Sequence, residues 1–254
     1  MSMLCIKNLT KRFGGVMAVN DVSFEVPAGS IMGLIGPNGA GKTTVFNLIT
    51  GICRPDQGEI IFDEKSIVNL LTHNIISLGI ARTFQTIRLF QNLSVLENVL
   101  AGRHSRMKSG SLRAMLRTPF QRGEEEAAIA KAVQTLNFVG LRRDAAQLAK
   151  NLSYGNQRLL EIARALATEP RLLILDEPAG GMNEQETTNL ITLIRKIRDQ
   201  RTTILLIEHD MSLVMRVCEN IVVLDYGAKI SEGTAETVKN DPLVIEAYLG
   251  TDEE

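Results

Sequence analysis

Residues 30–44 have the sequence SIMGLIGPNGAGKTT, in which an apolar run passes directly into a glycine-rich loop. The loop fits the pattern G-x-x-x-x-G-K-[ST] at Gly36, Gly41, Lys42 and Thr43. The pattern predicts a buried strand, backbone N–H groups that converge on phosphate, and a helix whose N-terminus adds partial positive charge. We therefore expect an α/β fold with a phosphate site at this strand-to-helix turn.

This segment also predicts the ligands of a nucleotide. Lys42 is expected to reach the β- and γ-phosphates of ATP, and the Thr43 hydroxyl is expected to bind Mg²⁺. The nucleotide-binding residues predicted here are Gly36, Asn38, Gly39, Ala40, Gly41, Lys42, Thr43 and Thr44.

A second apolar run, RLLILDEP at residues 171–178, ends in two acids. It places Asp176 at the carboxyl end of a buried strand, where α/β sheets bind ligands and an acid can hold Mg²⁺. The next residue, Glu177, is predicted to be the general base for water; the alternative is that it only caps the following turn. The segment LLIEHD ends another strand at His209, for which we favour a γ-phosphate contact over a purely structural role.

The rest of the chain alternates between three patterns. Residues 1–35 contain antiparallel strands, with apolar and polar residues alternating, and GEIIFDEKSI at 58–67 predicts one further strand. Residues 86–165 are helical; Ser94 and Glu97 form a predicted capping box, and the helix over 123–140 begins with acids in its first turn. After Pro170, buried strands alternate with helices, which indicates a mostly parallel sheet.

We therefore expect one domain over residues 1–254. Its α/β core comprises 1–85 and 166–254 and includes the N-terminal antiparallel β subdomain, and 86–165 form an inserted helical subdomain.

Composition narrows the choice of partners and compartment. The 254 residues have a net charge of −1, so we expect no nucleic-acid partner. No run approaches the roughly 20 apolar residues that cross a bilayer, and the N-terminus lacks a signal layout, so we expect a cytosolic protein. Cys5, Cys53 and Cys218 lack CxxC spacing and are predicted to be small core residues, with lipid modification of Cys5 as the alternative.

One stretch, residues 99–123, is basic and contains no acid. Two interpretations stay open: a solvated face, or a contact with a partner or with lipid headgroups. Its basic residues are Arg103, Arg106, Lys108, Arg113, Arg117 and Arg122.

In this order, the motifs resemble the ATP-binding cassette (ABC) family of transport ATPases over essentially the whole chain. GPNGAGKTT resembles the Walker A motif of that family and LLILDE its Walker B motif. The resemblance implies that Gln85 in ARTFQ touches Mg²⁺ and senses a membrane partner, and that His209 is the switch histidine. It also implies that Phe13 stacks on adenine; the alternative for Phe13 is a core position in the first strand.

The segment LSYGNQ at residues 152–157 resembles the signature motif of the family. Ser153 and Gly155 at a helix start would offer a hydroxyl, N–H groups and a positive dipole end to an anion. The resemblance implies a head-to-tail dimer in which these two residues act on the ATP of the partner subunit. A second ABC ATPase subunit is therefore required, and the sequence leaves open whether it is identical or only related.

Two departures from the family pattern leave the rate of hydrolysis open. LSYGN stands for the usual LSGGQ, so that Tyr154 and Asn156 replace Gly and Gln. The loop PAGGMN ends in Met182 and Asn183, where the family usually has Leu and Asp.

RTFQTIRLFQNLSVLENV at 82–99, DEPAGGMN and VIEAYLG at 244–250 resemble the ATP-binding subunits of bacterial branched-chain amino acid importers. This resemblance implies transmembrane permease subunits, an extracytoplasmic solute-binding protein, and a peripheral position on the cytoplasmic face of the inner membrane. The ATPase of lipopolysaccharide export is the alternative, and Asn183 favours the importer. The transported substrate stays open.

Two functions of other classes fit less well. A nucleotide-driven clamp on nucleic acid usually has two cassettes or a long coiled coil, and this chain has neither sustained heptads nor net positive charge. An enzyme that transfers phosphate to a metabolite would leave Gln85 and the LSYGNQ segment without a function.

Overall fold

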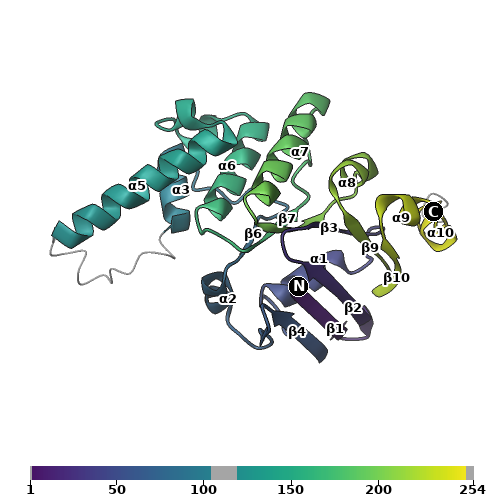
Figure 1. Cartoon of the computed structure of the whole chain (residues 1–254). Helices are drawn as coiled ribbons and strands as arrows, with labels where there is room; N and C mark the ends of the chain where they lie inside the picture. Colours follow the sequence, from purple (N-terminus) through teal and green to yellow (C-terminus); the bar gives the residue numbers. More distant parts are fainter. Residues whose placement is uncertain (1, 104–118, 250–254) are drawn as a thin grey trace.

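The computed structural model describes residues 2–103 and 119–249, apart from the side chains of 119–122 and 249. Within these residues two sheets form the framework, one of four strands in the order β2-β1-β4-β5 and one of six in the order β10-β9-β3-β8-β7-β6 (Figure 1). The strands of the first sheet are β1 (Ser2–Phe13), β2 (Val16–Pro27), β4 (Gln57–Phe62) and β5 (Lys65–Ser66). Those of the second are β3 (Ile31–Ile35), β6 (Ile80–Arg82), β7 (Leu172–Asp176), β8 (Thr203–Ile207), β9 (Asn220–Asp225) and β10 (Ala228–Gly233).

The six-stranded sheet is parallel from β9 to β6, and only β10 runs antiparallel to its neighbour. Every residue of β3, β7 and β8 is buried, because both faces of the sheet are covered. The predicted α/β fold with a mostly parallel sheet is confirmed. Since β3 and β7 both flank β8, their carboxyl ends lie at one edge and bring the glycine-rich loop near the two acids.

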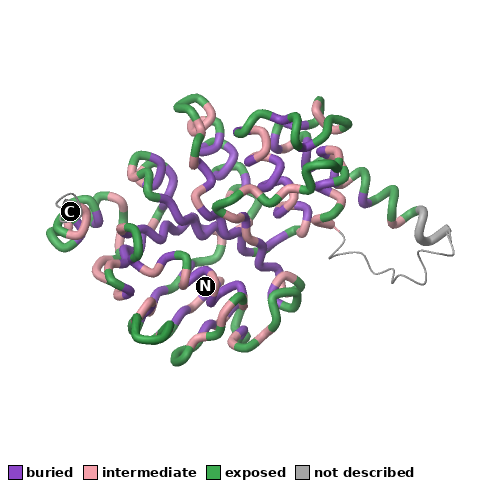
Figure 2. The backbone as a smooth tube through the Cα atoms, turned by 180° about the vertical axis from the view of Figure 1, so that it is seen from behind, coloured by how far each residue is buried: buried purple, intermediate pink, exposed green. Residues whose placement is uncertain are grey.

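The two faces of this sheet bury different cores. Ile31 and Ile35 of β3 pack with α6, α7 and α8, whereas Met32 and Leu34 pack with α1 and the four-stranded sheet. Figure 2 shows the buried backbone running through the sheet between these two layers. Successive residues of a strand point to opposite faces, so each buried strand contributes to both cores.

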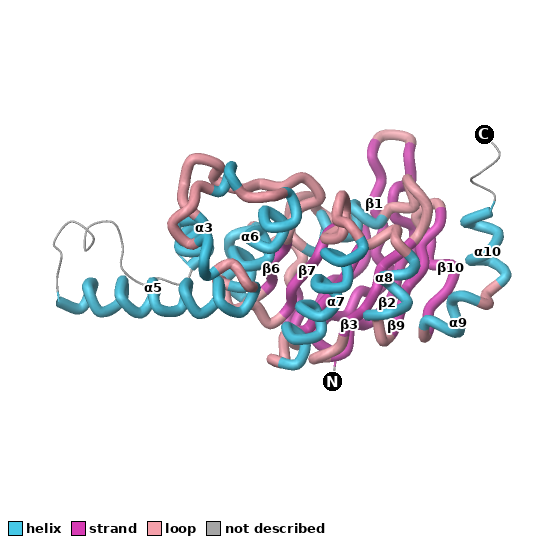
Figure 3. Tube along the Cα trace, turned by 90° about the horizontal axis from the view of Figure 1, so that it is seen from above, coloured by secondary structure: helices cyan, strands magenta, loops and turns pink. Residues whose placement is uncertain are grey.

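The helices surround this framework. Figures 1 and 3 show α3, α5 and α6 grouped at one end of the molecule, from which α5 projects, and α10 at the opposite end. The helices are α1 (Lys42–Ile49), α2 (Thr72–Leu78), α3 (Val95–Arg103), α5 (Pro119–Val139), α6 (Tyr154–Leu166), α7 (Glu184–Asp199), α8 (Met211–Val217), α9 (Ala235–Lys239) and α10 (Pro242–Leu249). None of the described helices is both long and apolar enough to span a membrane. The proposed boundaries of the helical insertion, 86 and 165, stay a prediction.

Several local predictions can be compared with the structure. Ser94 and Glu97 form the expected capping box, because the Ser94 N–H donates to Glu97 Oε2 at 2.7 Å and the Glu97 N–H to Ser94 Oγ at 3.2 Å. The helix predicted from residue 123 begins earlier, at Pro119, so its first turn contains no acid. The strand predicted over 58–67 is divided into β4 and β5, because Asp63 and Glu64 adopt positive φ angles of 48° and 65° and form a turn.

The structure agrees only in part with the predictions for the cysteines, and it describes only part of the basic stretch 99–123. Cys218 is buried as predicted, and the half-buried Cys53 packs against the core of α1 and the four-stranded sheet, whereas Cys5 is half-buried in β1. Within the basic stretch, Arg103 pairs with Glu169 at 3.1 Å. The side chains of Arg106, Lys108, Arg113, Arg117 and Arg122 lie outside the described residues.

Candidate active site

The glycine-rich loop joins β3 to α1 in a conformation that requires glycine at both motif positions. Gly36 and Gly41 have φ angles of 149° and 97°. A Cβ atom would lie 2.1 Å from the Leu224 carbonyl oxygen at Gly36 and 2.4 Å from the Ala18 carbonyl oxygen at Gly41. The loop is therefore pressed against β9 and β2, which fixes its backbone. Between the motif glycines lie Asn38, Gly39 and the buried Ala40, and Thr43 and Thr44 lie in the first turn of α1.

Lys42 begins α1 and points back into the loop. Its ammonium donates to the carbonyl oxygens of Gly36 and Pro37 at 2.6 and 2.7 Å, and the residue is only 9% exposed. Burial lowers the pKa of Lys42, and the carboxylates of Glu177 and Asp176 act against this shift. A lysine charge is thus held at the predicted phosphate position, in the field of the two acids.

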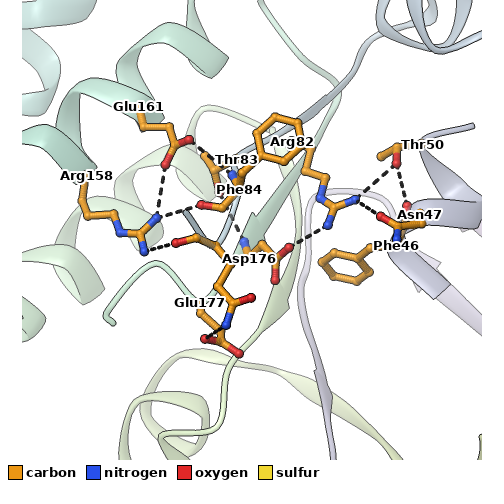
Figure 4. A network of polar contacts seen from close by, with 11 residues as sticks. Phe46, Asn47, Thr50, Arg82, Thr83, Phe84, Arg158, Glu161, Asp176 and Glu177 are labelled. Carbon is orange, nitrogen blue, oxygen red and sulfur yellow. Dashed lines mark hydrogen bonds and ion pairs between the residues drawn. The ribbon is translucent and has the colours of Figure 1, made fainter. Parts of the chain in front are cut away.

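Asp176 at the end of β7 is held by an arginine that the sequence interpretation did not identify. Arg82 of β6 donates to Asp176 Oδ2 at 2.7 Å, and the two side chains are 7% and 5% exposed (Figure 4). Arg82 also donates to Asn47 Oδ1 of α1 at 2.8 Å, so it connects three elements of the site. The sequence contained one signal for this role. An arginine in an apolar strand is expected to be buried, and a buried arginine requires a partner.

Glu177 lies beside two predicted site residues from distant segments, Gln85 and His209. Gln85 donates from Nε2 to Glu177 Oε2 at 2.9 Å, and His209 Nδ1 lies 3.9 Å from Glu177 Oε1. The residue has a positive φ of 46°, and its N–H donates to the Ile207 carbonyl at 2.9 Å. Its backbone carbonyl closes the turn to Gly180 at 3.2 Å while its side chain faces Gln85 and His209. The side chain of Glu177 thus contacts two predicted site residues, and its role as general base stays a prediction.

Ser153 and Gly155 lie away from this group, at the start of α6. Ser153 is the N-cap, and its Oγ accepts from the Asn156 N–H at 3.3 Å. Gly155 is buried, and a Cβ atom there would lie 2.5 Å from Glu186 Oε1 of α7. Asn183 caps α7 in a capping box with that same Glu186, with both hydrogen bonds at 2.9 Å. The LSYGNQ segment and the start of α7 thus form one packed unit.

Phe13 occupies the last position of β1. Its side chain is 51% exposed, and the Lys11 ammonium lies 5.4 Å from the ring centre. The alternative that Phe13 is a core residue is wrong. Its stacking on adenine stays a prediction.

The chain matches two family models. The model described as ABC transporter matches residues 19–180, and the model described as branched-chain amino acid ATP-binding cassette transporter matches residues 228–254.

Curated relatives and solved structures match the chain over almost its whole length. The chain is 46% identical to the high-affinity branched-chain amino acid transport ATP-binding protein LivG of Salmonella typhimurium and 45% identical to BraF of Pseudomonas aeruginosa, over 98% of each chain in both cases. A solved nucleotide-free ATP-binding cassette of an ABC transporter has a TM-score of 0.85 at 33% identity, and an ADP conformation of such a cassette has 0.86 at 34%. Both cover 98% of this chain and 99% of the solved chain.

Proposed function

The chain belongs to the ABC transporter family of ATPases, and we propose that it hydrolyses ATP to energise an importer of branched-chain amino acids. The observation that carries this proposal is the 45–46% identity to LivG and BraF over 98% of each chain. The match of residues 228–254 to a branched-chain-specific model supports the same cargo. A lipopolysaccharide exporter or an importer of another cargo is the alternative within the family.

The loop geometry supports nucleotide binding. The N-terminus of α1 and Lys42 place positive charge where the β- and γ-phosphates are expected. The remaining predicted contacts come from the backbone of 36–41 and the hydroxyls of Thr43 and Thr44. Phe13, exposed at the end of β1, is proposed to stack on adenine.

The same residues fit Mg²⁺. This ion prefers oxygen ligands and is usually held by one or two carboxylates together with substrate phosphates. Asp176, the Thr43 hydroxyl and the Gln85 side-chain oxygen supply such ligands, and the described residues contain no cluster of acids, histidines and cysteines that would cage a metal alone. When bound, Mg²⁺ would neutralise phosphate charge.

Hydrolysis is assigned to the group around Glu177. In this proposal a water molecule attacks the γ-phosphorus, Glu177 accepts a proton from that water, and the bond to the ADP oxygen breaks. Gln85, bonded to Glu177 at 2.9 Å, orients this carboxylate, and His209 contacts the γ-phosphate from the end of β8.

The position of the LSYGNQ segment supports a second ATPase subunit as partner. Ser153 caps α6 and Gly155 lies in its first turn, whereas the glycine-rich loop leads into α1, which supports their proposed action on the ATP of a partner subunit. The second subunit is an identical or related cassette. We propose that the pair sits on the cytoplasmic face of the inner membrane beneath permease subunits, which receive solute from an extracytoplasmic binding protein.

The test compares wild type with Glu177→Gln, in purified protein and in cells that lack the gene. We expect Glu177→Gln to bind ATP with unchanged affinity, to release phosphate at least 100-fold more slowly, and to fail to restore uptake of labelled leucine. Glu236→Gln, an exposed position on α9, is the control and should match wild type in all three assays.

Two results would contradict the proposal separately. Wild-type turnover by Glu177→Gln would remove the assigned role of Glu177. Unchanged leucine uptake in cells without the gene would remove the cargo and leave the ATPase assignment standing.

A further inference from the structure

A buried ion pair lies on α6, one to two turns after Ser153. Arg158 Nη1 lies 3.3 Å from Glu161 Oε2, and the side chains are only 5% and 2% exposed. Burying two charges is costly unless further hydrogen bonds satisfy them. The additional contacts of this pair therefore indicate what it does.

Those contacts go to the backbone on both sides of Gln85. Arg158 donates from Nη1 to the Phe84 carbonyl at 2.8 Å and from Nη2 to the Gln85 carbonyl (Figure 4). Glu161 Oε1 accepts from the N–H groups of Phe84 and Arg88, both at 3.4 Å. Residues 84–88 are thus tied to α6 through a donor fork and an acceptor.

The network continues to the loop that follows Glu177. Arg158 Nη2 also donates to the Tyr154 hydroxyl at 3.2 Å. The Tyr154 ring packs against Gly181, where an added Cβ would lie 2.8 Å from ring carbon Cε1. One guanidinium therefore connects the backbone of Gln85 with the helix that begins at Ser153, and Tyr154 extends this connection to the 178–182 loop.

We propose that Arg158 and Glu161 are positioning residues that make residues 84–88 and the start of α6 move as one piece. The position of Gln85 beside Glu177 and the orientation of Ser153 toward the partner subunit's nucleotide then change together. This inference rests on the proposed ATPase function and names the side chains that connect its two phosphate-contacting parts.

The chemistry of the pair supports positioning over simple helix stability. Helix α6 already buries Leu160, Ile162 and Ala163 in the core. A buried ion pair rarely adds stability over neutral side chains of similar shape. The planar guanidinium, however, can bond two successive carbonyls in a fixed geometry, which the point charge of lysine cannot reproduce.

Two variants distinguish a positioning role of the ion pair from a role in helix stability. Arg158→Gln/Glu161→Gln removes both charges together, so no buried charge is left unpaired. Arg158→Lys keeps the charge opposite Glu161 and loses the fork. Arg171→Lys is the control for loss of a fork, because Arg171 also makes a forked contact, to the exposed Asp63 at 2.5 and 2.8 Å, at the amino end of β7. The measurements are urea unfolding, KM for ATP, kcat, and ATP-dependent dimerisation in a Glu177→Gln background.

If the proposal is correct, the urea midpoint of the double variant lies within a few tenths of molar of the wild-type midpoint, and its KM stays within twofold. Its kcat falls at least tenfold, because a small misplacement of catalytic groups costs up to about 100-fold. Arg158→Lys also lowers kcat without changing KM or stability, but by a smaller factor. Arg171→Lys matches wild type.

A kcat within twofold of wild type in both Arg158 variants would overturn the proposal. The proposal would also be overturned if, in both Arg158 variants, kcat fell only in proportion to the fraction of protein that is no longer folded. If wild type hydrolyses no ATP, the proposed function fails, and the dimerisation assay tests the inference instead. Dimers that form as readily in the variants as in the Glu177→Gln parent would overturn the inference. Weakened dimers would support it.

Discussion

Replacement of Arg82 by methionine isolates the ion pair that holds Asp176 at the candidate active site. Methionine is unbranched and fills a similar volume without the charge. The variant leaves the Asp176 carboxylate at a position that is 5% exposed, with its cationic partner removed. We expect a large loss in the free energy of unfolding of the nucleotide-free protein.

The magnitude follows from burial. Removing one partner of a buried ion pair costs about 3–5 kcal/mol, a large share of the roughly 5–15 kcal/mol typical of a folded protein. Arg198 and Glu219 form a pair at 2.6 Å whose side chains are 35% and 44% exposed. Its loss in Arg198→Met should cost only about 0.2–1 kcal/mol. The two N···O distances differ by 0.1 Å, so burial decides the difference.

The assay is urea unfolding at pH 7 of wild type, Arg82→Met, Asp176→Asn, Arg198→Met and the double variant Arg82→Met/Asp176→Asn. Because the double variant removes both charges, it should recover most of the loss, and the cycle separates the pair from the contact of Arg82 with Asn47. A loss in Arg82→Met no larger than that in Arg198→Met would refute the reasoning, since Asp176 would then be solvated or otherwise paired.

Three further perturbations test other parts of the site. Lys42→Ala should lower ATP affinity at least tenfold in calorimetry, and unchanged affinity would remove the phosphate-loop assignment. Gly155→Ala places a Cβ 2.5 Å from Glu186 Oε1, so it should disturb the capping box of α7 and cost about 1 kcal/mol in urea unfolding; an unchanged midpoint would show that Glu186 moves aside freely. Burial raises the pKa of Glu208 in the folded protein, so this carboxyl stabilises the fold below its ordinary pKa, and that stability is lost as pH rises through the raised value. Glu208→Gln should therefore gain stability relative to wild type as pH rises above the ordinary pKa of a glutamate, and a difference that stays constant with pH would contradict the raised pKa.

The phosphate-binding loop was predictable because its determinants are local. Gly36 and Gly41 are required by backbone angles within one turn, and Lys42 follows directly. The acids were predictable because an apolar run that ends in Asp176 and Glu177 marks the carboxyl end of a buried strand. Both inferences need only the residues beside the motif.

The supporting residues were not predictable, because their partners are distant in sequence. Arg82 and Asp176 are 94 residues apart, and Arg158 reaches Phe84 across 74 residues. Sequence patterns place each residue on a strand or helix but do not pair them. The beginning of α5 was also misplaced, since the acids after residue 123 favour a helix start there although the helix continues toward Pro119.

The strand order of the six-stranded sheet also has a consequence for synthesis of the chain. The central strand β3 (Ile31–Ile35) lies between β8 (Thr203–Ile207) and β9 (Asn220–Asp225), which leave the ribosome about 170 and about 190 residues later. The neighbouring strands β1 and β2 form a local antiparallel pair that can assemble early. A nascent chain that ends before Asn220 carries the whole glycine-rich motif, yet it lacks the strand that presses on Gly36. We therefore expect nucleotide to stabilise the chain only after β9 has been synthesised.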